Sequence, residues 1–235
     1  MPRKDSLLTR IENAVPSASR TIGRIAISLA FLYAAFLVAS LIVIPVLAPG
    51  ARIPNPFGPD DASRTFFLSN TRSIQISNFL QLVSACCFAG LAAALAELQK
   101  SKGASSIAST MTQIGGIGGA VLLSLTALCS WAIASPGAID PGPALHTLQF
   151  LPFLFGGPGW AGFFALFLAG VAMGAKSILP RWVSAFGYFL SVVSALAMLV
   201  LVTINASPCL PVARFLGFLW LILVSVLLAR RPSLS

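Results

Sequence analysis

The chain has 235 residues, of which 57% are hydrophobic and only 9% are charged, with a formal net charge of +9. An average soluble domain carries roughly 25% charged residues, so this composition argues against a soluble fold. The Lys and Arg residues lie in short clusters at the ends of apolar runs, which is typical of membrane topology and not of a nucleic-acid-binding surface.

The first apolar run follows a basic segment, residues 1–24, and extends from Ile25 to Ala48 without one charged residue. The hydrocarbon core of a bilayer takes about 20 residues of helix, whereas the apolar region of a secretory signal has about 7 to 15. We therefore interpret the run as an uncleaved first membrane span.

Five further apolar windows follow, joined by short polar segments. Together they predict an all-α fold: a polytopic integral membrane bundle of six helices over residues 25–229, with a tail at residues 230–235. The expected spans are 25–48, 74–97, 111–135, 149–174, 182–204 and 211–229.

The longest connection, residues 49–73, is rich in Pro and Gly in its first half. Asp60 and Asp61 come next, just before the apolar residues Phe66, Phe67 and Leu68. Carboxylates at the start of a helix cap its free amides and oppose its dipole. The sequence therefore predicts a short interfacial helix here, with the two Asp residues as structural caps.

Three carboxamide side chains follow one another at intervals of three residues in the second span: Gln75, Asn78 and Gln81. Three residues advance a helix by about 300°, so the three side chains share one side of the span. Hydrogen bonding to a neighbouring helix is one interpretation of such residues. A polar pocket open to the outer side is the other.

Small residues form two helix-packing motifs: GGIGG at residues 115–119 and a G-x-x-x-G made by Gly170 and Gly174. Glycine lets helix backbones approach closely in lipid. The motifs predict packing within the chain, and they leave open a homo-oligomer formed through one of these Gly-rich faces.

The loop before the fourth span holds Asp140, His146 and Gln149. His146 is the single histidine, which excludes a zinc site with three histidines and a haem held by two histidines of one chain. The four cysteines form no C-x-x-C pair, so we expect no metal and no cofactor, and we interpret the cysteines as free thiols.

The fourth span contains Pro152, Pro158 and several Gly residues, so it is either kinked or re-entrant. The positive-inside rule distinguishes these cases, because removing one span moves every later loop to the other side. Six spans and a cytoplasmic N-terminus divide the 15 Lys and Arg residues 11 to 4, whereas a re-entrant fourth segment gives 8 to 7. Six spans with both termini cytoplasmic, in the plasma (inner) membrane, are therefore expected. The outer four are Arg52, Arg64, Arg72 and Arg214.

Ionisable residues deep in a membrane usually mark a proton path or a voltage sensor. The sequence places every Asp, Glu, Lys and Arg in a loop or near the end of a span. The first half also lacks a broken helix to match the fourth span, as inverted-repeat transporters have. Both features argue against ion-coupled transport.

A family resemblance rests on three motifs: LHTLQFLPFLFGGPGWAGF at residues 145–163, LPRW at residues 179–182, and FLGFLWLILVSVLLARR at residues 215–231. In these the chain resembles uncharacterised six-helix bacterial membrane proteins that carry domain-of-unknown-function labels. The resemblance implies an inner-membrane location, and it implies no activity and no catalytic residue.

Three functional hypotheses remain. The favoured one is a structural, interaction or small-ligand-binding role without chemistry of its own, with the lipid bilayer as partner and no nucleic acid. The second is a transporter or permease-like protein for a small solute, with an outer vestibule formed by Gln75, Asn78, Gln81, His146 and Gln149. The third is a membrane enzyme whose outer surface brings together Asp60, Asp61, Asp140 and His146.

Overall fold

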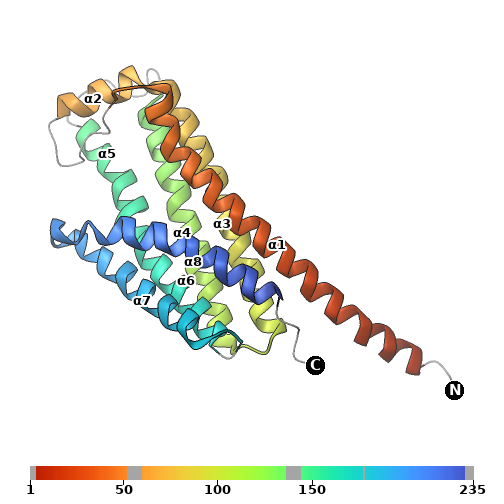
Figure 1. The fold of residues 1–235 in the computed structure, drawn as a ribbon. Helices are drawn as coiled ribbons and strands as arrows, with labels where there is room; N and C mark the ends of the chain where they lie inside the picture. Colours follow the sequence, from red (N-terminus) through yellow and green to blue (C-terminus); the bar gives the residue numbers. More distant parts are fainter. Residues whose placement is uncertain (1–3, 52–59, 136–143, 177, 231–235) are drawn as a thin grey trace.

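The structure, a computed structural model, describes residues 4–51, 60–135, 144–176 and 178–230, and for residues 4–18, 60–61 and 144–147 it describes the backbone only. Throughout these ranges the chain is helical, with short connections and no strand (Figure 1). The elements are α1 (Lys4–Leu47), α2 (Asp60–Ser69), α3 (Thr71–Ser101), α4 (Ser106–Ile133), α5 (Ala144–Leu154), η1 (Phe155–Gly159), α6 (Trp160–Ala175), α7 (Arg181–Ala197), η2 (Met198–Leu201), η3 (Ile204–Ala206) and α8 (Cys209–Arg230).

Six helical segments of the described chain are long and apolar enough to cross a membrane, as predicted. They are Ser19–Leu47, Thr71–Ser101, Ser106–Ile133, Leu148–Ala175, Arg181–Leu201 and Ile204–Arg230. Several extend beyond the predicted bounds, because a helix continues into polar residues that an apolar window leaves out. The short helix expected at Asp60 is also present, as α2.

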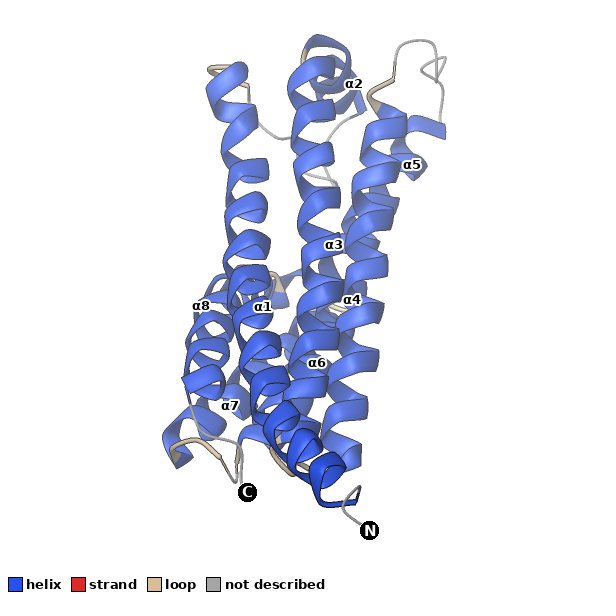
Figure 2. Cartoon of the chain, turned by 90° about the vertical axis from the view of Figure 1, so that its right-hand side faces the viewer, coloured by secondary structure: helices blue, strands red, loops and turns tan. Residues whose placement is uncertain are grey.

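The bundle has two chemically different ends. α1 begins and α8 ends at the same end, whereas α2 and α5 lie at the other (Figures 1 and 2). The loops after α3 and α6 also lie at the end with the termini. The loop after α3 contains Lys102, which is buried, and this burial lowers the pKa of its amine. Among the residues whose side chains the structure describes, the cations at this end are Arg20, Arg24, Lys100, Lys102, Lys176, Arg181 and Arg230, and those at the α2 end are Arg64 and Arg72.

The fourth span occupies the centre of the bundle. α6 contacts α4 along one side and α7 along the other, and it also touches α3 and α8. Its aromatic residues Trp160, Phe164 and Phe167 are completely buried. The rings of Trp160 and Phe164 stack with their centroids 4.4 Å apart. The fourth span therefore packs against four of the other spans, whereas α1 packs against α3 and α8.

Glycine allows α4 and α6 to touch backbone to backbone. A Cβ atom on Gly170 would lie 2.5 Å from the backbone nitrogen of Thr112, and one on Gly115 would collide with the backbone of Phe167. Gly174 meets the side chain of Gln99 on α3 equally closely. The predicted small-residue motifs thus pack within the chain, and the homo-oligomer stays a prediction.

Serine hydroxyls connect the helices through backbone carbonyls. Ser84 donates to the carbonyl of Tyr33 at 2.9 Å, which joins α3 to α1. Ser191 and Ser194 of α7 donate to the carbonyls of Ala165 and Ala161 of α6, each at 2.8 Å. Such bonds hold helices together in lipid, where no hydrophobic effect drives apolar helix faces together.

One buried carboxamide connects three helices near the end that holds the termini. The Nε2 atom of Gln99 donates to the carbonyls of Gly170 at 3.3 Å and Val171 at 3.4 Å. The hydroxyl of Thr112 donates to the Oε1 atom of Gln99 at 3.1 Å. Gln99 is completely buried, so this side chain is the interhelical glue of the bundle at this level.

The α7–α8 hairpin is shorter than the helices around it. The hydrogen bonds of Ser191 and Ser194 to α6 place the end of α7 beside η1, in the middle of the fourth span. The turn between α7 and α8 therefore lies well below the α2 end of the bundle (Figure 2). Its apolar residue Val202 is 85% exposed, which suits a turn surrounded by hydrocarbon. α8 consequently begins at the level of η1 and not at the α2 end of the bundle.

A side-chain cap begins α4. The hydroxyl oxygen of Ser105 accepts a hydrogen bond from the amide of Ala108 at 3.3 Å. Ser105→Ala is expected to lower the free energy of unfolding by about 1 kcal/mol, because the amide loses its partner. Ser106→Ala, one residue further on, serves as the control and should change stability much less. A denaturant titration that finds equal losses for the two variants would contradict this assignment.

Candidate functional site

The fourth span is broken at its centre. Pro158 has no amide hydrogen to donate, and Gly157 adopts φ −95° and ψ −105°, outside the helical region. The amide of Trp160 donates to the carbonyls of Phe155 and Gly157. In a regular α-helix this amide would bond to Gly156 instead. The π-type turn of η1 therefore leaves the carbonyl of Gly156 available to another partner, and the fourth span is kinked and continuous, not re-entrant.

Arg214 takes up this free carbonyl. Its Nη2 atom donates a hydrogen bond to the carbonyl oxygen of Gly156. Its guanidinium carbon also lies 4.5 Å from the centroid of the Trp160 ring, in cation–π geometry. Gly156 must be glycine here, since a Cβ atom would lie 2.8 Å from the side chain of Thr126.

Arg214 lies near the start of its helix, as the sequence predicts, but not near an end of the fourth span, which it contacts. The residue belongs to the second turn of α8, and the short α7–α8 hairpin places that turn beside Gly156 and Trp160. These partners lie in the middle of the span Leu148–Ala175. The sequence placed Arg214 on the outer side, near the start of the sixth span, because hydropathy does not give the depth at which the α7–α8 hairpin turns.

A cavity of about 400 Å³ adjoins the guanidinium group. This size falls within the range of about 300–1,000 Å³ that is usual for small-molecule pockets. Three of its lining side chains are polar, and they come from α3, α4 and α8. The lining consists of Leu41, Gln81, Thr126, Pro152, Phe153, Gly156, Gly157, Leu210, Pro211, Arg214 and Phe215, and we call it the break pocket.

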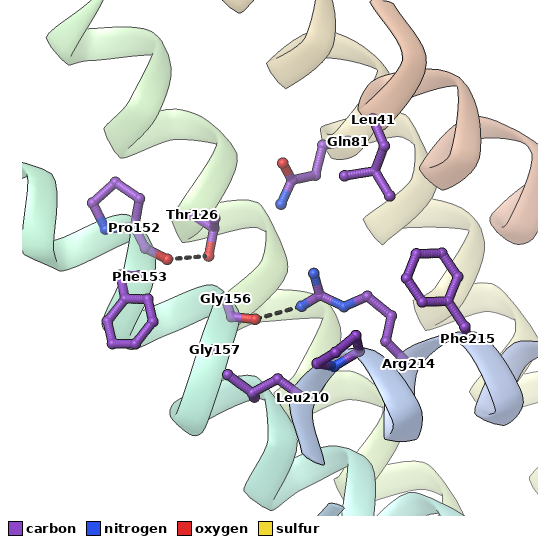
Figure 3. Close-up of a pocket in the computed structure, with 11 residues that line it drawn as sticks. Leu41, Gln81, Thr126, Pro152, Phe153, Gly156, Gly157, Leu210, Arg214 and Phe215 are labelled. Atoms are coloured by element: carbon purple, nitrogen blue, oxygen red, sulfur yellow. Dashed lines mark hydrogen bonds between the residues drawn. The ribbon is translucent and has the colours of Figure 1, made fainter. Parts of the chain in front are cut away.

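Polar groups converge on the break pocket from two sides (Figure 3). The side chains of Gln81 and Arg214 point toward each other across it. Thr126 donates to the carbonyl of Leu122 at 2.9 Å and, more weakly, to that of Pro152 at 3.4 Å. Gln81, Thr126 and Leu41 all lie in the parts of their helices nearer to α2 and α5, so the pocket belongs to that half of the bundle.

The charge of Arg214 has no acidic partner in the part of the chain that the structure describes. The ion pair found there joins Lys100 to Glu97 at 3.6 Å and is exposed. The Nε atom of Arg214 is buried without a hydrogen-bond partner. The described residues also contain no cluster of three His, Cys, Asp or Glu side chains that would hold a metal ion. The site is thus a cation whose described neighbours include the Trp160 ring, the Gln81 carboxamide and Tyr33, which interacts with its charge and whose buried hydroxyl has no hydrogen-bond partner.

The residues predicted for the vestibule are separated in the structure. Gln81 lines the break pocket, whereas Asn78 is buried and lines a separate groove between α3 and α4, with its Nδ2 atom unpartnered. Gln75 is partly buried, one turn nearer the start of α3. Gln149 is buried on α5, one turn before Pro152 of the pocket lining.

The residues of the enzyme hypothesis lie outside the described side chains. Asp60 begins α2 with Asp61 after it, and His146 belongs to α5, but only the backbone is described at these positions. Asp140 lies outside the described residues. The four cysteines are free thiols, as interpreted from the sequence, although Cys86 is exposed.

Sequence reasoning missed Arg214 and Thr126. A usable signal for Arg214 was present: a lone arginine within an apolar run, five residues after Cys209, together with a helix-breaking segment elsewhere. Thr126 carries no such signal, because a threonine in an apolar helix usually bonds its own backbone.

Comparison of the chain with protein-family models, with curated proteins and with solved structures gives no match in any of the three.

Proposed function

We propose that this multi-pass membrane protein binds a small solute in the break pocket and carries out no chemistry of its own. The observation that carries the proposal is the 400 Å³ cavity at the break of the fourth span, with Gln81, Thr126 and Arg214 converging on it. Irregular backbone at membrane depth persists where it is buried in protein or lines a cavity. A solute pocket accounts for the break and for the polar side chains together.

The direction of the pocket follows from the charges. Seven described cations lie at the end that holds the termini, and two lie at the α2 end. Cytoplasmic loops of membrane proteins carry the excess of Lys and Arg. This distribution supports cytoplasmic termini in a plasma (inner) membrane and a break pocket in the outer half of the bundle.

Cysteine labelling tests whether water reaches the pocket. In a variant whose four native cysteines are replaced, Gln81→Cys should react with a membrane-impermeant maleimide at least about tenfold faster than Phe79→Cys, because the reactive thiolate needs water around it. Phe79 is the matched control: it lies on the same helix, nearer the α2 end, and its side chain is 62% exposed on the lipid-facing surface. Equal rates, or no reaction at Gln81→Cys, would overturn the proposal.

A permease-like role is the second candidate, and the broken fourth span favours it. Discontinuous helices commonly form the substrate sites of transporters near the bilayer midplane. Labelling of Gln81→Cys from each side of reconstituted vesicles separates the two roles. A fixed binding pocket reacts from one side only, whereas a permease reacts from both sides as the pocket alternates between them.

A further inference from the structure

We infer that the solute of the break pocket is an organic anion, whose oxyanion head meets the guanidinium of Arg214 and whose apolar body fills the rest of the cavity. The inference rests on the proposed function, since it names the class of solute that the same pocket takes. It also accounts for Arg214, the one charged side chain among those described that contacts the middle of the fourth span.

The guanidinium of Arg214 lacks a counter-charge among the described residues. Arginine stays protonated in proteins, so Arg214 carries a full positive charge. A charge at the centre of a bilayer costs at least about 2.5 kcal/mol. The carbonyl of Gly156 and the ring of Trp160 supply partial negative charge only, and the one carboxylate whose side chain is described, Glu97, pairs with Lys100. An anionic ligand would complete the neutralisation.

The guanidinium of Arg214 has more N–H donors than the described protein acceptors use. A guanidinium group has five N–H donors in a planar fork that matches the two oxygens of a carboxylate. Within the described structure one protein acceptor, the carbonyl of Gly156, is bonded to Arg214. The Gln81 side chain faces the guanidinium across the pocket and has no hydrogen-bond partner among the described residues (Figure 3). Its amide NH₂ group is a further donor to an oxyanion held between them.

Apart from its three polar side chains, the lining of the break pocket is apolar. Leu41, Phe153, Leu210 and Phe215 surround the polar groups with apolar surface. A cavity of about 400 Å³ is far larger than one oxyanion group needs. The ligand therefore combines a carboxylate or phosphate head with a compact apolar body, as a free organic acid or the head region of an anionic lipid does.

The decisive experiment measures binding to the full-length protein in phosphatidylcholine nanodiscs. The probes are benzoate, 4-phenylbutyrate and octanoate, each beside its neutral carboxamide, and equilibrium dialysis gives the affinities. At least one carboxylate should bind saturably and at least about tenfold more tightly than its amide, because the amide has no negative charge to pair with the guanidinium and offers it one acceptor oxygen instead of two. This preference is measured on the unmodified chain, so it does not depend on the folding of a variant.

Two variants then locate the effect. Arg214→Gln should weaken carboxylate binding at least about tenfold and abolish the preference over the amide. Arg72→Gln removes an exposed cation near the α2 end and should leave both unchanged. Equal binding of acid and amide, or an acid affinity that Arg214→Gln does not alter, would overturn the inference.

Nanodiscs that contain phosphatidylglycerol separate the two sources of the anion. If the natural ligand is a lipid head, phosphatidylglycerol should compete with the soluble acid, and native mass spectrometry should show it retained by the unmodified protein and lost from Arg214→Gln. If the ligand is a free acid, phosphatidylglycerol should have no effect while the carboxylate binds. Both results support an oxyanion at Arg214.

Failure of the inference remains distinct from failure of the proposed function. If Gln81→Cys is labelled from water but none of the carboxylates and no phosphatidylglycerol binds through Arg214, the pocket stands and the anion is wrong. If Gln81→Cys is not labelled, the solute pocket and the anion fall together.

Discussion

Gly170→Ala is expected to lower the free energy of unfolding by about 3 kcal/mol, at the upper end of the range typical of overpacking. The added methyl group would lie 2.5 Å from the backbone nitrogen of Thr112 and 2.9 Å from the carbonyl oxygen of Ala108. Both are backbone atoms of α4, so neither can move aside without separating α4 from α6. Thermal unfolding in detergent, or titration with dodecyl sulfate, measures the loss.

Gly162→Ala is the matched control on the same helix. There the added methyl group would lie 3.0 Å from the Sδ atom of Met198, the far end of a flexible side chain. Methionine rearranges easily, and alanine favours a helix over glycine by up to about 1 kcal/mol, so this variant should be neutral or slightly more stable. Equal destabilisation by both substitutions would show that the α4–α6 contact is less rigid than described.

Gln99→Glu is expected to cost about 3 kcal/mol or more at neutral pH. The carboxylate has no hydrogen to donate to the carbonyls of Gly170 and Val171, and its charge would be buried. Gln99→Leu is the comparison, because it removes the same hydrogen bonds without adding a charge. Interhelical hydrogen bonds in a membrane average about 0.6 kcal/mol, so the leucine variant should lose roughly 1 kcal/mol. Similar unfolding midpoints for the two variants would contradict the buried position of this side chain.

The six spans could be predicted because their cause is local. A run of about 20 apolar residues is sufficient to cross a bilayer, and each of the six spans contains one. The break in the fourth span was also readable, since Pro158 removes a donor wherever it stands in a helix. The start of α2 at Asp60 followed from capping chemistry in the same way.

The site could be predicted only in part, because its geometry depends on packing between distant segments. The pattern of Gln75, Asn78 and Gln81 identified a polar side of α3. In the structure, however, Gln81 lines the break pocket, whereas Asn78, one turn away, lines the groove between α3 and α4. Arg214 meets Gly156 because the hydrogen bonds of Ser191 and Ser194 to α6 end α7 at the middle of the fourth span. The local sequence gives no signal for the level at which α7 ends. Hydropathy predicts the length of a span but not its position along the axis of the bundle.

The short α7–α8 hairpin also gives the molecule an uneven cross-section. At the level of the termini six spans stand side by side, whereas toward α2 and α5 the hairpin has already turned back and the segments α1, α3, α4 and α5 continue alone (Figure 2). The described spans therefore taper toward the α2 end, so a bilayer around them would lose more lipid area from the leaflet at the end with the termini. A wedge fits best in a bilayer whose curvature matches its taper, so the same hairpin that places Arg214 beside the break also couples the shape of the protein to the shape of its membrane.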